Sequence, residues 1–332
     1  MSNKFLPVSI IIPVYNEEKN IENTLSSLIN QDYPKKMIEI IIVDGRSTDR
    51  TLEKIKDITE DNVGVKFKIL ENNYRLQGYG LNIGIENISP DTQIIIRADA
   101  HSIYPENYIS ECIKTILEKE ADNVGGVMCP VGKSFVQKAI ALCMRHPLGV
   151  GDSKFHRGNY SGYVDTVYLG CFKKKVFEKV GKFDPLMTPN EDAELNLRIT
   201  KSGGKIYLNK AIKVLYYPRE NIKRLAVQYF SYGRGRCRTF LKHKTFTSLR
   251  QIIPIVWLFL SIFSLIGGVF ISYTFLFPII LYFFVLIFAT LIELVRKCKL
   301  FILLFPICLM VMHYSWALGF IVEYVISFFS KK

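Results

Sequence analysis

The chain has 332 residues, 49% of them hydrophobic, and it carries a formal net charge of +13. This hydrophobic share is high for a wholly soluble protein, so part of the chain is expected to lie in a membrane. The seven cysteines show no CxxC pair and no metal-ligand spacing, which argues against a disulfide scaffold or a zinc site and favours a reducing cytoplasm.

Four apolar runs rich in isoleucine and valine, each followed by a helical pattern, open the chain: VSIIIPV, IEIIIVDG, VKFKILEN and TQIIIRADA. Alternating strands and helices predict an α/β fold with a mostly parallel central sheet. Ligands bind such sheets beyond the carboxyl ends of the strands. The first run leads into the acidic sequence NEE and has no small-residue cleavage site, so we expect this part of the chain to stay in the cytoplasm.

Acidic side chains follow the first two runs. Glu17 lies near the start of a helical pattern, where backbone N–H groups favour an anion, although Asn16, Glu17 and Glu18 can also serve only to cap the helix. Asp44 ends the second run in DGRSTD and either faces a ligand or forms an Asx turn. An acidic group at each of two neighbouring strand ends is an arrangement that holds a base and a ribose.

The fourth run ends in RADAH, which places Asp99 at the end of a strand. A metal that bridges two phosphates prefers hard oxygen ligands at such a position. His101 is an unusual ligand for Mg²⁺ but a tolerable one for Mn²⁺. The alternative is that His101 is simply a loop histidine.

The later sequence TPNEDAELNLRI opens another helical pattern. Thr188, Pro189 and Glu191 match a capping box with proline in the first turn, so Glu191 can be purely structural. Asp192 follows a long polar loop and is suitably placed to take a proton from a hydroxyl nucleophile.

Basic residues gather between residues 219 and 250, where nine lysines and arginines face one glutamate. Because this segment runs directly into apolar sequence, anionic lipid headgroups explain it better than nucleic acid does. Apolar residues recur in it at helical spacing, which predicts an amphipathic helix lying on the inner membrane face.

Residues 252–292 contain no Asp, Glu, Lys or Arg, enough for about two membrane crossings. Residues 300–329 form a further apolar stretch, which spans or is re-entrant near Pro306. The predicted membrane helices are 252–272, 275–295 and 300–325. Basic residues flank the first two crossings on one side, which the positive-inside rule assigns to the cytoplasm. We therefore predict a multi-pass protein of the inner membrane. We predict three parts: a cytoplasmic domain (1–218), the interfacial helix (219–245) and a membrane domain (246–332).

Six motifs occur in a fixed order: VSIIIPVYNEEKNI, IEIIIVDGRSTDRT, LNIGI, DAH, GC before VFEKVGKFD, and EDAELNLRI. In this order and spacing, over about residues 6–240, the chain resembles the family 2 glycosyltransferases. The DAHSIYP variant, the segment QYFSYGRGRCRT and the C-terminal hairpin look most like the membrane-bound glucosyltransferases of succinoglycan and related exopolysaccharide assembly. The resemblance implies a GT-A fold.

The resemblance also implies roles for particular residues. Those implied to bind the donor are Pro13, Tyr15 and Glu17 in the nucleoside pocket, Asp44 at the base, and Asp99 at the ribose or the metal. A divalent metal, Mn²⁺ or Mg²⁺, is implied at Asp99, and His101 holds the position of the second metal ligand. We expect this histidine to favour Mn²⁺ over Mg²⁺.

Asp192 is implied to be the catalytic base of an inverting reaction, with Glu191 beside it close to the acceptor. The base deprotonates an acceptor hydroxyl, which attacks the anomeric carbon in line as the diphosphate leaves. The Gln-x-x-Arg-Trp motif of processive synthases is missing, because both tryptophans lie in apolar segments. Gln228, Arg234 and Arg236 can stand in by holding a diphosphate, which favours an enzyme that adds a single sugar.

The sequence thus predicts transfer of a hexose, most simply glucose from UDP-glucose, to a polyprenyl-diphosphate-linked saccharide at the inner membrane face, in exopolysaccharide or cell-surface glycan biosynthesis. The expected partners are this UDP-hexose donor, the lipid-linked acceptor and membrane lipids, without nucleic acid. The alternative is a catalytically silent nucleotide-sugar-binding or scaffold membrane protein, against which Asp44, Asp99 and Asp192 argue together. A nucleotidylyltransferase would need a lysine-bearing, glycine-rich loop where the chain has PVYNEE.

Overall fold

The computed structural model describes residues 5–62, 64–246 and 248–330. The chain forms two compact units, the first from Met1–Cys129 with Lys154–Tyr216 and the second from Pro130–Ser153 with Tyr217–Lys332. The first unit holds the sheet, and the second holds the long apolar helices. Residues 130–153 leave the first unit and join the second, which no pattern in the sequence indicated.

Half of the sheet is parallel, as the sequence predicted. Its strands lie in the order β3 (Lys66–Glu71), β2 (Ile38–Asp44), β1 (Val8–Val14) and β4 (Ile94–Arg97). The register pairs Val14 of β1 with Asp44 of β2, and Ile11 with Arg97 of β4. Because parallel strands end at the same edge, the polar clusters after β1, β2 and β4 meet there.

The other half of the sheet is largely antiparallel. Strand β8 (Tyr168–Lys173) pairs antiparallel with β4 and with β6 (Asn123–Pro130), and beyond β6 lie β9 (Ile206–Tyr216) and β5 (Ser102–Ile103). The short β7 (Gly162–Tyr163) pairs with β9. Within the described residues the sheet has nine strands, and its parallel half confirms the predicted α/β core.

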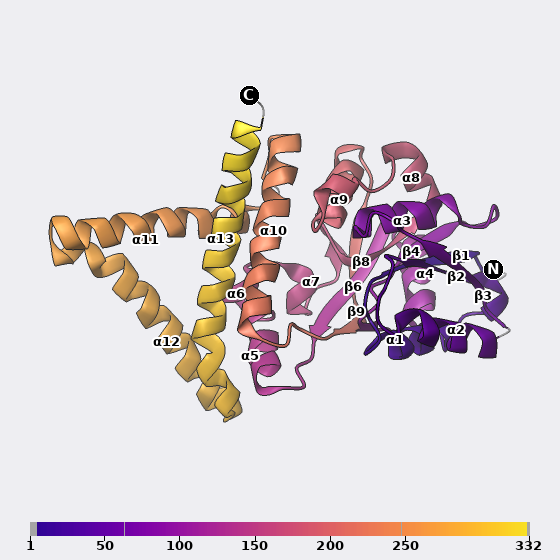
Figure 1. Ribbon diagram of the computed structural model, residues 1–332, viewed down its shortest axis with the longest axis horizontal. Helices are drawn as coiled ribbons and strands as arrows, with labels where there is room; N and C mark the ends of the chain where they lie inside the picture. The colour runs from indigo at the N-terminus through magenta and orange to yellow at the C-terminus, as the bar shows by residue number, and fades with distance from the viewer. Residues whose placement is uncertain (1–4, 63, 247, 331–332) are drawn as a thin grey trace. The chain divides into compact units, whose positions relative to one another are not determined.

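Helices cover both faces of the sheet (Figure 1). Strand residues alternate between two buried clusters, as a period of two requires: Ile10 and Ile12 face one cluster and Ile11 the other. The first cluster also takes residues from α1 (Ile21–Ile29), α2 (Thr51–Asp61) and α4 (Tyr108–Glu118). The second takes residues from α3 (Gln77–Glu86), α8 (Lys174–Val180) and α9 (Glu191–Lys201). Strands buried on both faces explain the nearly unbroken apolar runs.

Short helical segments lie between these elements in the first unit. They are η1 (Lys35–Met37), η2 (Pro185–Met187) and α7 (Lys154–Arg157). Helix α3 lies tightly against the sheet, since a Cβ atom on Gly84 would stand 2.3 Å from Ile11 Cγ2. The glycine of the LNIGI motif therefore permits the close packing that fixes α3, whose N-terminal residue Gln77 enters the site described below.

In the second unit, α10 (Ile222–His243) runs beside α13 (Phe305–Phe329) (Figure 1). A Cβ atom on Gly233 would lie 2.0 Å from the Trp316 carbonyl oxygen, and one on Gly319 would lie 2.0 Å from that of Phe230. Small residues are what let two helix backbones approach so closely. The helix predicted within the basic segment is therefore present as α10, and glycines on both helices form its contact with α13.

A carboxylate on α13 reinforces this contact. Arg234 Nε donates to Glu323 Oε2 over 2.6 Å, and Arg238 Nε donates to Oε1 over 2.7 Å. Glu323 is buried, and a buried carboxylate requires a partner of opposite charge. Two arginines of the basic segment thus bind a carboxylate of the same unit.

In the described part of the chain, three helical stretches are long and apolar enough to cross a membrane: Ile253–Phe270, Tyr273–Lys297 and Leu300–Phe329. The first is α11, the second joins η4 (Tyr273–Leu276) to α12 (Phe277–Lys297), and the third joins η5 (Leu300–Leu304) to α13. Pro306 stands in the first turn of α13, where proline is tolerated, and the helix continues unbroken to Phe329. Lys331 and Lys332, expected beyond the third crossing, lie outside the described residues.

Polar side chains join these apolar helices. Trp257 Nε1 donates to Tyr314 Oη over 3.1 Å, and Tyr282 Oη lies 2.9 Å from His313 Nδ1. The remaining elements of this unit are α5 (Phe135–Cys143), α6 (Pro147–Val150) and η3 (Leu249–Gln251). Helix α5 begins with a capping box between Ser134 and Gln137, which satisfies backbone groups at its exposed start.

Glu39 of β2 is buried, although its side chain is a carboxylate. It accepts hydrogen bonds from Ser9 Oγ, Ser89 N and Ser89 Oγ over 2.8 to 2.9 Å, and Lys68 Nζ lies 2.9 Å away. Burial alone raises the pKa of Glu39. The hydrogen bonds from Lys68, Ser89 and Ser9 lower the pKa by more than burial raises it, and the result is a pKa of about 2.

We expect E39Q to destabilise the protein at neutral pH but not in acid. Because the pKa of Glu39 falls from 4.5 to about 2 on folding, its stabilising contribution is complete above the unfolded value and is lost as the pH falls through the folded value. The shift corresponds to about 3 kcal/mol. Unfolding of the full chain in detergent at pH 7 and near pH 2 measures this difference, and an equal loss of stability at both pH values would contradict it.

Candidate active site

The loops after β1 and β2 are tied to each other by hydrogen bonds. Asn16 N donates to Ser47 Oγ over 2.9 Å, Thr48 N donates to Asn16 Oδ1 over 2.8 Å, and Glu17 N donates to Thr51 Oγ1 over 2.8 Å. Asn16 adopts a φ of 53°, a left-handed conformation that asparagine tolerates better than most residues. The NEE and DGRSTD loops therefore form one continuous surface at the edge of the sheet and do not act only as caps of two separate helices.

Asp44 uses its carboxylate within its own turn. Ser47 N donates to Oδ2 over 3.0 Å and Ser47 Oγ donates to Oδ1 over 2.6 Å, and only 4% of Asp44 is exposed. The carboxylate thus serves its own loop, as in the alternative offered from the sequence, but it bonds a residue three positions on and not two, as an Asx turn would. The binding of a base by Asp44 stays a prediction.

Tyr15 presents an aromatic surface at the same edge, with 45% of the residue exposed. The Arg75 guanidinium lies 5.7 Å from the centroid of its ring, within the range of a cation–π contact. Pro13 of β1 contacts Gly80 of α3, since a Cβ atom there would lie 3.3 Å from Pro13 Cβ. An exposed aromatic ring with a cation above it can stack a nucleobase.

The RADAH stretch brings Arg97 and Asp99 to one place. Strand β4 ends at Arg97, so Asp99 lies two residues beyond it. Gln77 Nε2 donates to Asp99 Oδ1 over 3.2 Å, and Arg97 donates to the same oxygen over 3.3 Å. Asp99 N donates to Tyr104 Oη over 2.8 Å, which fixes the backbone that carries the carboxylate.

Arg97 joins this aspartate to the start of α9. Its guanidinium lies 3.5 Å from Glu191 Oε1 and forms an ion pair with Asp192 Oδ2. Only 9% of the Arg97 side chain is exposed. Asp99, Glu191 and Asp192 therefore share one buried cation, which leaves the group with a net negative charge.

These charges shift the pKa values of their neighbours. Burial by itself lowers the pKa of Arg97, but the carboxylates of Asp99 and Glu191 raise it to above its ordinary value, so the guanidinium stays charged. Burial raises the pKa of Glu191, an effect that Arg97 only partly offsets. Burial and the Asp99 charge raise the pKa values of Tyr104 and Tyr168 well above the ordinary value, so both phenols stay neutral.

Several polar atoms of this group are buried and, within the described residues, have no hydrogen-bond partner: Arg97 Nε, Glu191 Oε2 and Asp192 Oδ1. Buried polar atoms are nearly always satisfied in proteins, and exceptions mark functional positions or bound molecules. Three such atoms from two segments of the chain meet around one guanidinium, which makes this group the strongest candidate for the reacting centre.

The capping box proposed for Thr188, Pro189 and Glu191 is wrong. Helix α9 begins at Glu191 with Asn190 as its N-cap, without a capping hydrogen bond from that side chain, and Thr188 Oγ1 instead donates to Pro185 O over 3.2 Å. The Glu191 carboxylate instead lies against the Arg97 guanidinium. Only 2% of the Glu191 side chain is exposed, against 27% for Asp192, so a substrate reaches Asp192 more readily.

His101 lies beside the first loop. Its Nδ1 atom is 3.1 Å from Glu17 Oε1, and its ring centroid is 5.6 Å from that of Tyr216. The structure therefore joins two residues for which the sequence predicted separate roles, His101 at the metal and Glu17 in the nucleoside pocket.

No group of three His, Cys, Asp or Glu side chains within the described ranges could hold a metal by itself. A metal that bridges phosphates needs only one or two protein ligands, because the substrate and water supply the rest. Asp99 offers a carboxylate oxygen and His101 an imidazole, and the net negative charge around Arg97 favours a cation. These residues fit a metal that arrives with a diphosphate, rather than a preformed cage.

The remaining predicted residues, Arg234 and Arg236, lie on α10 in the second unit. Arg234 binds Glu323, and Gln228 Nε2 donates to Tyr232 Oη over 2.9 Å. Their proposed contact with a diphosphate stays a prediction.

Sequence reasoning gave no role to Arg97, Gln77 or Tyr104. A signal for Arg97 was present, because residues two apart at a strand end point to the same side, so Arg97 accompanies Asp99. No local signal connects Gln77 or Tyr104 with Asp99, since those contacts depend on how α3 and the loop after β4 fold.

Residues 9–181 match the model of the glycosyl transferase family 2. The chain is 35% identical over 246 residues to the succinoglycan biosynthesis protein ExoA of Rhizobium meliloti, covering 74% of each chain. It is 33% identical over 325 residues to a dolichyl N-acetyl-α-D-glucosaminyl phosphate 3-β-D-2,3-diacetamido-2,3-dideoxy-β-D-glucuronosyltransferase of Methanococcus voltae, covering 94% of this chain and 95% of the relative.

Among solved structures, a mannosyltransferase from Pyrobaculum calidifontis in complex with GDP-Man and Mn²⁺ is similar, with a TM-score of 0.65 and 16% identity over 97% of this chain and 88% of that one. Residues 1–349 of TarS from S. aureus align with a TM-score of 0.51 and 18% identity, covering 77% of this chain and 79% of that one. These likenesses confirm the predicted GT-A fold. With the family match and the sequence relatives, they establish that the chain is an enzyme of the glycosyl transferase family 2.

Proposed function

We propose that the protein is an inverting hexosyltransferase that moves one sugar, glucose from UDP-glucose, to a lipid-linked saccharide in exopolysaccharide or cell-surface glycan biosynthesis. The observation that carries this proposal is the meeting of Asp99, Glu191 and Asp192 around Arg97. A reaction between two bound sugars needs a proton acceptor on one side and charge stabilisation on the other, and this group provides both.

The relatives support the direction of the proposal. One takes its name from succinoglycan biosynthesis, and the name of another includes a dolichyl-linked sugar phosphate. Glycan assembly on a lipid carrier requires the enzyme to work at a membrane surface, and the long apolar helices suit that. The lack of a Gln-x-x-Arg-Trp motif favours addition of one sugar over polymer extrusion.

Asp192 is the base in this mechanism. Its Oδ2 atom is held by Arg97, while Oδ1 is buried and makes no hydrogen bond within the described residues. Its lone pairs can accept the hydroxyl proton when a bound acceptor enters the site and contacts it. The positive charge of Arg97 favours the ionised carboxylate. Glu191 fixes Arg97 from the buried side.

In this proposal, the donor nucleotide binds at the part of the strand edge formed by the ends of β1 and β2 and the loops after them. Tyr15 stacks on the base, with Pro13, Glu17 and Asp44 forming the walls of the nucleoside pocket. Asp99 and His101 would hold a divalent metal, which neutralises the leaving diphosphate when bound. The structural relative in complex with GDP-Man and Mn²⁺ supports a metal of this kind.

We further propose that residues 1–218 work on the cytoplasmic face of the inner membrane, with the segment 219–245 at the interface and 246–332 in the bilayer. The basic residues on either side of the first two apolar helices support this orientation. The alternative, a silent nucleotide-sugar-binding or scaffold protein, predicts binding without transfer and is tested below.

Replacing Asp192 with asparagine removes the proposed base and leaves the donor pocket unchanged. We expect D192N to slow transfer by at least about 100-fold, the lower range of general-base catalysis, with unchanged donor affinity. Release of nucleoside diphosphate from UDP-glucose and other nucleotide sugars, with a lipid-linked acceptor, measures the rate. D91N is the matched control, since Asp91 is exposed. Full turnover by D192N would disprove the assignment, and donor binding without turnover by the wild type would favour the scaffold alternative.

Arg97 is expected to position the base. In R97M the three carboxylates repel each other without their shared cation, so Asp192 moves away from the acceptor and kcat falls by about 100-fold, while R97K recovers part of the rate. The exposed Arg50, which pairs with Glu53 on the surface, provides the control R50M. A wild-type kcat in R97M, measured on protein shown to be folded, would show that Arg97 has no such role.

His101 is expected to set the metal preference. Replacing it with aspartate supplies a hard oxygen ligand in place of nitrogen, so the ratio of activity with Mn²⁺ to activity with Mg²⁺ should fall in H101D. Transfer rates measured across a concentration series of each metal give this ratio. The same ratio in the wild type, H101D and H101A would show that His101 is not a ligand.

A further inference from the structure

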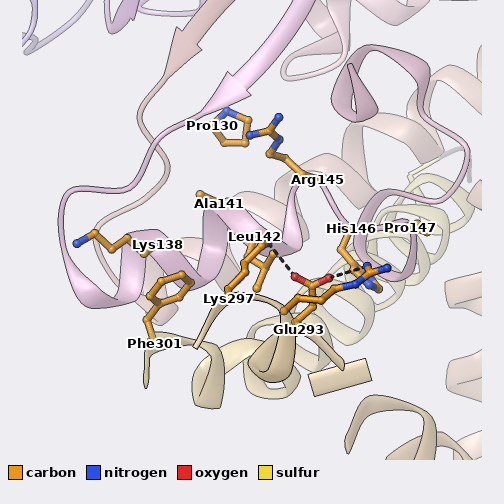
Figure 2. A pocket seen from close by; sticks show the side chains of 11 residues that line it. Pro130, Lys138, Ala141, Leu142, Arg145, His146, Pro147, Glu293, Lys297 and Phe301 are labelled. Atoms are coloured by element: carbon orange, nitrogen blue, oxygen red, sulfur yellow. Dashed lines mark ion pairs between the residues drawn. The ribbon is translucent and has the colours of Figure 1, made fainter. Parts of the chain in front are cut away.

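The second unit contains a cavity of about 550 Å³ where the end of α12 and the start of η5 meet α5 and the turn after it (Figure 2). This volume lies within the usual range for small-molecule sites. Its walls combine apolar and cationic side chains: Pro130, Lys138, Ala141, Leu142, Arg145 and His146 with Pro147, Glu293, Arg296, Lys297 and Phe301.

The lining carries more positive than negative charge. Lys138, Arg145, Arg296 and Lys297 face the single carboxylate of Glu293, which gives a net charge of +3. Burial lowers the pKa of the neighbouring His146, so its imidazole is neutral at neutral pH and adds nothing. A cavity with this excess is suited to an anion.

Two of the four cations have an ordinary structural explanation. Arg296 and Lys297 occupy the last turn of α12, where they oppose the negative end of the helix dipole. They also pair with Glu293, at 3.6 Å and 2.8 Å respectively (Figure 2). These two cations balance the charge of Glu293 without help from α5.

Lys138 and Arg145 have no such explanation. They come from a part of the sequence far from α12, and no acidic side chain within the described ranges forms an ion pair with either of them. Arg145 also lies beyond the end of α5, in the turn toward α6. Both side chains are exposed, as are those of Arg296 and Lys297, so all four cations are accessible to an anion that enters the cavity.

The cavity also lies where charged and apolar surfaces meet. Immediately before Arg296, the helix α12 exposes Leu291, Ile292 and Val295, and η5 after it exposes Leu300 and Leu303. These residues belong to stretches apolar enough to cross a membrane. An occupant with an anionic head and apolar chains satisfies both surfaces, whereas a free anion satisfies only the cavity.

We propose that this cavity binds the phosphate-bearing headgroup of an anionic membrane lipid, with Lys138 and Arg145 as the phosphate contacts and the lipid chains against α12 and η5. Acidic glycerophospholipids and polyprenyl phosphates share this chemistry. The site is separate from the proposed transfer reaction, and its test needs no turnover.

Native mass spectrometry of the full chain in detergent tests the proposal. The probes are phosphatidylglycerol, a polyprenyl phosphate and zwitterionic phosphatidylcholine, each titrated separately. We expect the wild type to prefer one or both anionic lipids, and K138Q/R145Q to bind the preferred lipid about 30-fold more weakly, the loss expected for two basic residues at a lipid surface. Which of the two anionic lipids loses affinity identifies the natural occupant.

K36Q/K56Q, which removes two exposed lysines of the first unit, is the matched control and should bind as the wild type does. The charge-conserving K138R/R145K should also retain binding. If the double variant does not fold, the single variants at these two exposed positions give the same comparison. Unchanged anionic-lipid affinity in K138Q/R145Q, an equal loss in K36Q/K56Q, or no preference over phosphatidylcholine would overturn the proposal.

Discussion

The candidate active site depends on one constraint, that several carboxylates cannot be buried together without a cation. Arg97 supplies this cation. It contacts Asp99 from its own strand end and Glu191 and Asp192 from the start of α9, segments that are nearly a hundred residues apart. The parallel sheet fixes where β4 ends, and α9 packs on the same face as α3. The polar edge therefore takes its shape from apolar packing beneath it.

Much of the fold could be predicted because its signals are local. Unbroken apolar runs marked the parallel strands, and helical spacing marked α10 and the apolar helices. The antiparallel pairing of β8, the transfer of residues 130–153 to the second unit and the contacts of Glu191 could not be predicted, because they depend on distant partners. The capping motif shows where local signals fail. The capping box forms between Ser134 and Gln137, but the Glu191 side chain contacts the buried Arg97 guanidinium and forms no cap.

The two units use charge in different ways. In the first, excess negative charge gathers at the strand edge, where a divalent metal would balance it. In the second, positive charge gathers at the end of α12 and along α10, where Glu323 binds Arg234 and Arg238. The net charge of +13 belongs wholly to the second unit, because the first unit has 26 lysines and arginines and 26 aspartates and glutamates.

The proposed mechanism makes a stereochemical claim, since an acceptor hydroxyl that is deprotonated by Asp192 and attacks the donor directly, without a covalent glycosyl-enzyme intermediate, inverts the anomeric carbon. The anomeric configuration of the product, followed by proton NMR from the first turnovers with an α-linked nucleotide hexose, tests this claim most directly. The account predicts a β-linked product. An α-linked product, formed with retention, would contradict it.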